Sequence, residues 1–234
     1  IYSLGSTLEM NNVHLLNNTA DQFGAGILFG SEVQNPNIEA LYIENSLFSN
    51  NTAGTRGGGM HVENANVNIL NSSINSNSAG HGGGAIYAIG SSVNISNALL
   101  EQNTSNSGGA IYYQDGVGPV SYDLNITNSH IANNNSSAAG GGLYLVSGNV
   151  LIKNTDIMNN YAVGSGGGIF EDHTDITNLS IVGSRITGNV TESDGGGIGL
   201  SNEGYTTIRR TLIANNQSAS WGAGIFTNHE FELS

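Results

Sequence analysis

The sequence contains no cysteine, only two prolines and only five basic residues among its 234. The absence of cysteine excludes a disulfide framework and a thiolate metal site. Five basic residues against a net charge of −13 cannot form the cationic face that nucleic-acid binding or an anionic membrane surface requires. No run of 18 apolar residues occurs, so nothing predicts a transmembrane helix. We therefore expect no nucleic-acid partner and no membrane insertion.

Glycine and asparagine dominate what is present, with 34 residues of each. Such a composition is common in disordered segments, but a hydrophobic content of 38% and nine tyrosines favour a folded chain. The composition therefore indicates a fold that uses glycine and asparagine at fixed turns, repeated many times.

Internal repeats make this explicit. A first series consists of an apolar residue after two or three small residues. A second consists of an apolar residue followed three positions later by asparagine, and a third lies five residues before the second. The first series is Ile27, Met60, Ile86, Ile111, Leu143, Ile169, Ile198 and Ile225, and Ile1 aligns with it. The second is Leu15, Phe48, Ile74, Leu100, Ile131, Ile157, Ile186 and Ile213. The third is Met10, Ile43, Ile69, Ile95, Ile126, Ile152, Ile181 and Ile208.

Each repeat therefore contains three short apolar segments, and the 224 residues that precede Ile225 contain eight repeats of 28 residues on average. Alternation within runs of three to five residues is typical of strands and too short for helices. The pattern predicts an all-β chain, a right-handed parallel β-helix with three strands per turn and about eight turns. A single such domain covers residues 1–234.

Asparagine recurs at two corners of the predicted turn. The first row follows the third series by two residues, where Gly183 and Arg210 replace asparagine in the last two turns. Tight corners need the left-handed backbone conformation, which glycine and asparagine tolerate best. The second row follows the second series, and we expect its amides to stack as a ladder. The structural corner residues are Asn45, Asn71, Asn97, Asn128 and Asn154 in the first row, and Asn51, Asn77, Asn103, Asn134 and Asn160 in the second.

The combination of Gly-Gly-Ala-Ile, at Gly83–Ile86 and Gly108–Ile111, with an upstream apolar-x-x-Asn motif resembles the repeats of the polymorphic outer membrane proteins. Phenylalanine, common at the apolar position of that motif, occurs there only at Phe48. The resemblance implies a right-handed β-helix, of the shape shared with pectate-lyase-like enzymes, in a surface-exposed protein with adhesive or structural roles.

The residue after each first-series position should point outward, and six of nine such residues are aromatic. One interpretation is cross-strand stacking that shields neighbouring small residues. The other is a contact ribbon for sugar rings or for a neighbouring rod. The ribbon residues are Tyr2, Tyr87, Tyr112, Tyr144, Phe170 and Phe226.

Three other features bear on function. Of the Asn-x-Ser/Thr sequences, those at Asn94, Asn125 and Asn178 are predicted to face outward as possible glycosylation sites. Length variation is confined to one corner, with insertions around residues 31–38, 115–121 and 172–178. The acidic residues that a carbohydrate-active enzyme would need scatter over different turns. They are Glu63, Asp115, Glu171, Asp172, Asp175 and Asp194, and we expect all six to be exposed.

These patterns favour a non-enzymatic, extracellular or cell-surface β-helix that acts as a stalk, fibre subunit or adhesin passenger, without cofactor or metal. The alternative is a polysaccharide lyase or glycoside hydrolase of the β-helix class. Ile1 begins directly on a predicted strand and nothing resembles a terminal cap. We therefore expect the ends to be covered by further repeats of a longer chain or by a second copy stacked end to end. Glycans or a neighbouring surface are the other expected partners.

Overall fold

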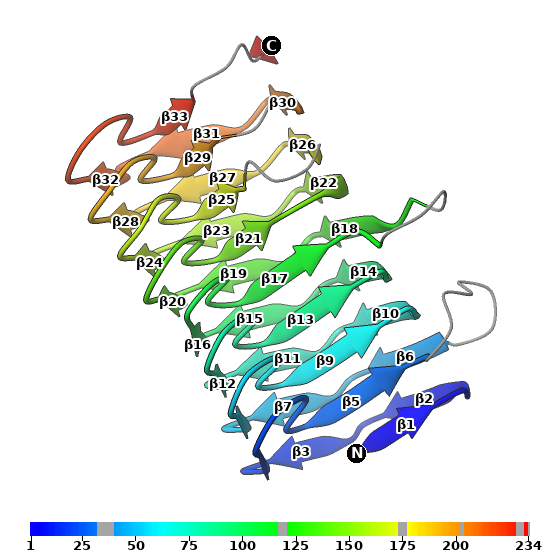
Figure 1. Ribbon diagram of the computed structural model, residues 1–234. Helices are drawn as coiled ribbons and strands as arrows, with labels where there is room; N and C mark the ends of the chain where they lie inside the picture. The colour runs from blue at the N-terminus through cyan, green and yellow to red at the C-terminus, as the bar shows by residue number, and fades with distance from the viewer. Residues whose placement is uncertain (32–39, 117–120, 173–176, 202–203, 228–231, 234) are drawn as a thin grey trace.

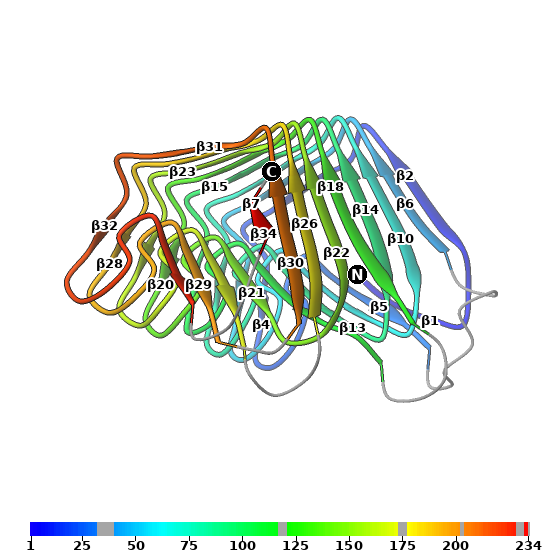
Figure 2. The same ribbon diagram turned by 90° about the horizontal axis from the view of Figure 1, so that it is seen from above.

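The computed structural model shows a β-solenoid in which every described strand pairs in parallel with its equivalent in the next turn (Figure 1). The structure describes residues 1–31, 40–116, 121–172, 177–201, 204–227 and 232–233. Regular structure in these ranges is entirely β, arranged in four sheets that we name A to D. The all-β parallel solenoid predicted from the repeats is confirmed. Figure 2 shows the sheets as sides of one continuous coil.

Sheet A contains the strands that follow the glycines. Its register places Ile86 beside Ile111, and Ile111 beside Leu143, as the repeat alignment predicts. The nine strands are β1 (Tyr2–Leu4), β5 (Ile27–Gly30), β9 (Met60–Glu63), β13 (Ile86–Ile89), β17 (Ile111–Gln114), β21 (Leu143–Leu145), β25 (Ile169–Glu171), β29 (Ile198–Leu200) and β33 (Ile225–Thr227).

Sheet B contains the longest strands, with apolar residues facing inward at every second position. Val67 and Ile69, for example, are buried beside Val93 and Ile95. The nine strands are β2 (Leu8–Asn11), β6 (Ala40–Glu44), β10 (Asn66–Leu70), β14 (Ser92–Ser96), β18 (Asp123–Thr127), β22 (Gly148–Lys153), β26 (Thr177–Val182), β30 (Tyr205–Arg209) and β34 (Glu232–Leu233).

Sheet C has three-residue strands, each with one inward residue from the second apolar series. Ile74 lies beside Phe48 on one side and Leu100 on the other. The eight strands are β3 (His14–Leu16), β7 (Leu47–Ser49), β11 (Ser73–Asn75), β15 (Leu99–Glu101), β19 (His130–Ala132), β23 (Asp156–Met158), β27 (Arg185–Thr187) and β31 (Leu212–Ala214).

Sheet D was not predicted. Its two-residue strands follow the second asparagine row, and a run this short has no alternation by which sequence could reveal it. The eight strands are β4 (Thr19–Ala20), β8 (Thr52–Ala53), β12 (Ser78–Ala79), β16 (Thr104–Ser105), β20 (Asn135–Ser136), β24 (Tyr161–Ala162), β28 (Val190–Thr191) and β32 (Gln217–Ser218). The three predicted strands of each turn are therefore joined by a fourth, shorter one.

The core is a column of Ile, Leu, Val, Met and Phe side chains from sheets A, B and C. Ile86, Ile95 and Leu100, one from each sheet of the same turn, are all almost completely buried. Burial of each such side chain contributes about 1.5–3 kcal/mol. Because every turn repeats this arrangement, the core runs along the whole described coil.

The glycines before sheet A are required by close contact between turns. A Cβ atom added at Gly109 would lie 2.2 Å from the carbonyl oxygen of Gly141, and one added at Gly84 would lie 2.3 Å from that of Gly109. Gly83 and Gly108 additionally have φ angles of 61° and 65°, which residues with a Cβ rarely adopt. The small-residue motif is thus a packing and backbone requirement of the turn.

The first asparagine row occupies the corner between sheets B and C. Each member has a positive φ, between 49° and 57°, and Gly183 adopts the same region at 61°. Arg210 also has a φ of 50°, so the last corner of the row keeps its backbone shape with an unfavourable residue. The row comprises Asn12, Asn45, Asn71, Asn97, Asn128 and Asn154.

The second asparagine row is a buried amide ladder, which we call the inner ladder. In each rung the backbone N–H and the side-chain Nδ2 both donate to the Oδ1 of the asparagine in the next turn. For Asn77 these distances to Asn103 are 3.0 and 3.1 Å, and Nδ2 also donates to the Phe48 carbonyl oxygen at 3.1 Å. The left-handed residue of this corner is the one before the ladder asparagine, including Ser76 and Gln102.

A third row, of hydroxyl groups, lines the inside of the corner between sheets B and C and was not predicted. The backbone N–H of Ser46 donates to the Oγ of Ser72, and the Ser72 hydroxyl donates to the Leu70 carbonyl oxygen. The same arrangement links Ser129, Thr155 and Ser184. This row satisfies buried backbone groups that the strands leave unpaired at the corner.

Candidate binding surfaces

A continuous stack of rings runs along the outer face of sheet A, and we call it the aromatic ladder. Its rings come from equivalent positions of successive turns, with centroids 5.0 Å apart for His61 and Tyr87, 4.7 Å for Tyr87 and Tyr112, and 5.2 Å for Tyr112 and Tyr144. Its members are Phe23, His61, Tyr87, Tyr112, Tyr144 and Phe170.

Four of the six predicted ribbon residues lie in this ladder, and two lie apart from it. Tyr2 pairs in register with Leu28 and is 68% exposed, while Phe226 pairs with Gly199 and contacts Trp221 instead. The outward direction predicted for these residues implies exposure to solvent, and this is wrong at Tyr87, which is only 4% exposed. Tyr112, Tyr144 and Phe170 are half-buried, so the ladder presents edges rather than open faces to solvent.

Phe23 and Arg56 take part in the ladder although they were not predicted to. They occupy the position four residues before the sheet A strands, where isolated bridges link Phe23, Arg56, Gly82 and Ser107. The Arg56 guanidinium lies 5.0 Å from the centre of the Tyr87 ring and 5.8 Å from that of Phe23, a cation–π arrangement. The sequence signal that could have placed Phe23 and Arg56 near the ladder is that they occupy equivalent positions in successive repeats.

His61 is buried within the stack, and its Nε2 lies 3.7 Å from a carboxylate oxygen of Glu63. Burial, and secondly the charge of Arg56, lower the pKa of His61 to about 4. Its Nδ1 has no hydrogen-bond partner among the residues that the structure describes. The imidazole is therefore neutral at pH 7 and packs as an aromatic ring.

The tyrosine hydroxyls at the other end of the ladder are held protonated. Burial, followed by the charges of Tyr87 and Asp172, raises the pKa of Tyr112 to about 12. Tyr144 donates to the Oδ2 of Asp172 at 2.5 Å, and burial and this hydrogen bond raise its pKa above the usual value. Both phenols are therefore neutral at pH 7, and that of Tyr144 acts as a hydrogen-bond donor.

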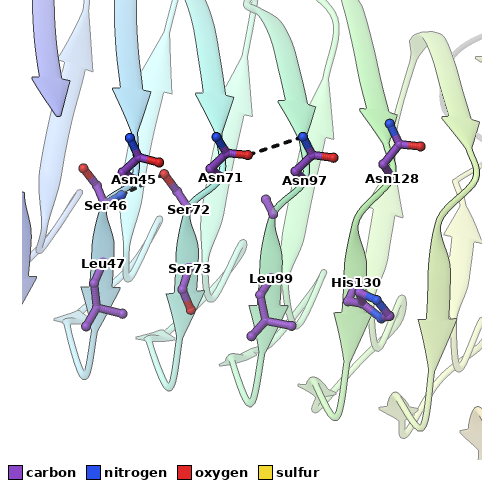
Figure 3. A pocket seen from close by; sticks show the side chains of 11 residues that line it. Asn45, Ser46, Leu47, Asn71, Ser72, Ser73, Asn97, Leu99, Asn128 and His130 are labelled. Atoms are coloured by element: carbon purple, nitrogen blue, oxygen red, sulfur yellow. Dashed lines mark hydrogen bonds between the residues drawn. The ribbon is translucent and has the colours of Figure 1, made fainter. Parts of the chain in front are cut away.

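A groove of about 450 Å³ lies at the corner between sheets B and C and spans four turns (Figure 3). One wall is the exposed amides of the first asparagine row, and the other is the first residue of each sheet C strand. Figure 3 shows the two rows side by side with Ser46 and Ser72 between them. The lining residues are Asn45, Asn71, Asn97, Asn128, Leu47, Ser73, Leu99, His130, Ser46, Ser72 and Ala98. We call this the corner groove.

Two of the predicted glycosylation positions lie in an outer amide ladder on sheet B. Asn125 Nδ2 donates to Asn94 Oδ1 at 3.0 Å, and Asn94 Nδ2 donates to Asn68 Oδ1 at 3.3 Å. Asn178 is exposed and donates to Asn149 Oδ1 at 2.9 Å. Modification at any of the three remains a prediction.

The acidic residues do not assemble into one site. Glu171 is 1% exposed, contrary to the expected exposure, because it occupies an inward position of β25 beside Leu145 and Leu200. Asp175 lies outside the described residues, as do most of the three corner insertions. Within the described ranges, no three His, Cys, Asp or Glu side chains are placed to hold a metal ion.

Comparison with known proteins links the chain to one repeat family through a short segment. A sequence model of the Chlamydia polymorphic membrane protein repeat matches residues 71–89. This segment contains both motifs that suggested the resemblance, the apolar-x-x-Asn of Ile74 and Asn77 and the glycine motif ending at Ile86. No curated protein and no solved structure matches the chain significantly.

The structure gives each part of that repeat a physical role. Ile74 enters the core from sheet C, Asn77 forms a rung of the inner ladder, and Gly83 and Gly84 allow the close turn before Ile86 enters the core from sheet A. The repeat therefore encodes one full transition from sheet C through sheet D to sheet A. In the part of the chain that the structure describes, no helix is long and apolar enough to cross a membrane.

Proposed function

We propose that this chain is an extracellular or cell-surface β-helix with a structural or adhesive role, such as a stalk, a fibre subunit or an adhesin passenger. The observation that carries the proposal is the distribution of its polar and aromatic side chains. They form rows that continue from turn to turn, in the inner ladder, the hydroxyl row and the aromatic ladder, instead of converging on one point. Rows of this kind stabilise a rod and present a repetitive surface.

Two further observations support this proposal. The matched repeat is one found in a membrane protein family, as expected for surface association. The net charge of −13 favours solubility and disfavours adsorption to anionic polymers. Location is tested by protease treatment of intact source cells, which should remove the chain while a cytoplasmic marker survives. Protection equal to that of the marker would contradict the proposal.

The aromatic ladder is the proposed contact for a neighbouring rod. Its half-buried edges at Tyr112, Tyr144 and Phe170 offer apolar area beside phenol oxygens that can accept hydrogen bonds, a combination typical of contact surfaces. Tyr87 is proposed to stabilise the stack and not to touch a partner, because it is buried.

The double variant Tyr112→Ser/Tyr144→Ser tests this contact. We expect at least a tenfold loss of self-association, measured by sedimentation velocity, with the circular dichroism of a β-solenoid retained. Tyr205→Ser is the matched control, since Tyr205 is 82% exposed on sheet B outside the ladder. Equal loss in both variants, or no loss in the double variant, would remove the ladder from the proposal.

The enzyme alternative is tested separately. The purified chain, incubated with acidic and neutral polysaccharides, should generate neither new reducing ends nor unsaturated products. Turnover of either kind would favour a lyase or hydrolase over the structural role.

A further inference from the structure

The corner groove differs from the aromatic ladder in position and chemistry. It lies between sheets B and C, whereas the ladder lies on sheet A. Its walls are amides and alternating apolar and polar side chains instead of stacked rings (Figure 3). It runs along the coil axis across four turns, which spans about 14 Å because successive strands lie about 4.8 Å apart.

We propose that the corner groove binds a short stretch of a linear, uncharged glycan laid along the coil axis. A chain of pyranose rings is suited to this shape because one ring is similar in length to one rung of the coil. Four rungs therefore offer contacts to three or four sugar units.

The amide wall supplies the hydrogen-bonding groups that sugar hydroxyls require. Each asparagine amide carries two N–H donors and a carbonyl oxygen with two lone pairs. The bond from Asn97 Nδ2 to Asn71 Oδ1, at 3.3 Å, uses one donor and one lone pair, which leaves a donor and an acceptor for a ligand. A free donor beside a free acceptor matches a pair of neighbouring hydroxyl groups. Asn45 and Asn128 extend the same wall and are exposed.

The opposite wall supplies apolar contact at alternate rungs. Leu47 and Leu99 are half-buried and flank the smaller Ser73 in the register of sheet C. The C–H faces of sugar rings pack on apolar side chains of this kind, and the recess at Ser73 leaves room for a ring substituent. Between the walls, Ser46, Ser72 and Ala98 are buried and form a closed floor.

The groove is fixed before any ligand arrives. The asparagine backbones are held in the left-handed region, and the floor hydroxyls of Ser46 and Ser72 donate to the carbonyl oxygens of Glu44 and Leu70 at 2.7 and 2.8 Å. Since the corner backbone and the floor are already ordered, binding costs little backbone entropy, and weak individual contacts add to a measurable affinity.

Charge selects an uncharged ligand over an acidic one. The lining contains no carboxylate, lysine or arginine, and its single titratable side chain, His130, has its Nδ1 3.4 Å from Asp156 Oδ2. Asp156 is in turn bound by Arg185 through two 2.7 Å hydrogen bonds. An acidic polysaccharide would find no lysine or arginine in the groove and would face the net charge of −13.

The test uses variants that keep the corner backbone. In Asn71→Gly/Asn97→Gly both central amides are removed, and the left-handed corner survives because Gly183 already occupies the equivalent position. Asn12→Gly/Asn154→Gly is the matched control, from the same row but outside the groove lining. Binding is measured by NMR titration and calorimetry with tetrasaccharides of β-1,4-linked glucose, N-acetylglucosamine and mannose, and with tetragalacturonate.

We expect at least one neutral tetrasaccharide to bind the unmodified chain with millimolar or better affinity, and to shift the side-chain amide signals of Asn71 and Asn97. Affinity should fall at least tenfold in the groove variant, and stay within twofold in the control and in Tyr112→Ser/Tyr144→Ser. No binding, equal binding by the groove variant, or tighter binding of tetragalacturonate would overturn the proposal. Loss of binding only in the tyrosine variant would assign glycan contact to the aromatic ladder and refute the groove. An extended peptide that displaces the sugar with higher affinity would also refute it.

Discussion

The two asparagine rows repeat the same residue along the coil, in six turns of the first row and in all eight of the second, yet they contribute to the molecule in opposite ways. In the inner ladder Asn103 is completely buried. Its Nδ2 donates to Asn134 Oδ1 and to the Ile74 carbonyl oxygen, and its own Oδ1 accepts from Asn77. In the first asparagine row, which we call the outer row, Asn97 is exposed, and its Nδ2 donates a single 3.3 Å hydrogen bond to Asn71 Oδ1. The inner row is needed for its side chain, and the outer row for its backbone.

This difference shows that a residue can recur in a repeat either for its side chain or for its backbone conformation, and that recurrence alone does not tell which. Natural replacements are consistent with the distinction. Gly183 stands in the outer row, where only the left-handed backbone matters. The inner row has asparagine in all eight turns, because glycine could not supply an amide to buried donors. The side chains of the outer row are therefore not needed to satisfy buried groups, and they are available to bind a ligand in the corner groove.

The largest expected effect comes from truncating one asparagine of each row in the same turn, which tests the side-chain role of one row against the backbone role of the other. Asn103→Ala leaves the buried backbone N–H and Nδ2 of Asn77 without their shared acceptor. Each unsatisfied buried group costs about 1–3 kcal/mol, so we expect a loss of about 3–5 kcal/mol in the free energy of unfolding. Urea denaturation followed by circular dichroism measures it.

The paired variant is Asn97→Ala, six residues earlier. Alanine in the left-handed region costs about 1–2 kcal/mol, and Asn97→Gly should recover most of that loss. A loss for Asn97→Ala as large as that for Asn103→Ala would contradict the assignment of side-chain and backbone roles.

A second test uses pH, because amides do not titrate whereas the buried ring of His61 does. The folded pKa of His61 is about 4, below its ordinary value of 6.5, so the unfolded chain binds the proton more tightly. Stability from the neutral imidazole is therefore complete above pH 6.5 and is lost as pH falls from 6.5 to 4. The difference of about 2.5 pH units corresponds to a loss of about 3 kcal/mol.

The measurement compares urea unfolding at pH 7.5 and pH 4 for the unmodified chain and for His61→Phe. Carboxylates titrate in both proteins, so only the difference between them isolates His61. The variant should lose about 3 kcal/mol less stability on acidification. An identical pH dependence would show that His61 is charged, or solvated, in the folded chain.

Much of the fold was predictable because each repeat restates it. The fixed five-residue spacing between Ile95 and Leu100, and its equivalents, determines which residues share the core, and the alignment of Ile86 with Ile111 is the register observed. Sheet D and the hydroxyl row were missed for a common reason. Two-residue strands have no alternation, and serine in a glycine- and asparagine-rich sequence does not reveal that it points inward, as Ser72 does.

The surfaces were less predictable than the core. Sequence placed Tyr87 on an outward position correctly, but alternation cannot show that a neighbouring segment carrying Arg56 covers it. The corner groove depends on the curvature between two sheets, which no local pattern encodes. Asn97 was predicted as a structural corner residue. The groove that it lines is formed by several stacked turns, and a single repeat does not show it.

The smallest expected effect concerns Arg210, the residue that departs from asparagine and glycine in the outer row. This residue holds the outer-row corner of the last turn at a φ of 50°, a conformation that a long side chain with a Cβ adopts at a cost of about 1–2 kcal/mol. Arg210→Asn restores the residue that six earlier turns use at this corner and should raise the free energy of unfolding by about 1 kcal/mol, seen as a higher denaturation midpoint. Arg209→Asn is the control, because Arg209 belongs to strand β30 and has no positive φ to relieve. If Arg210→Asn gave no gain, asparagine in this row would be retained for its exposed amide alone, and the backbone explanation of the outer row would be wrong.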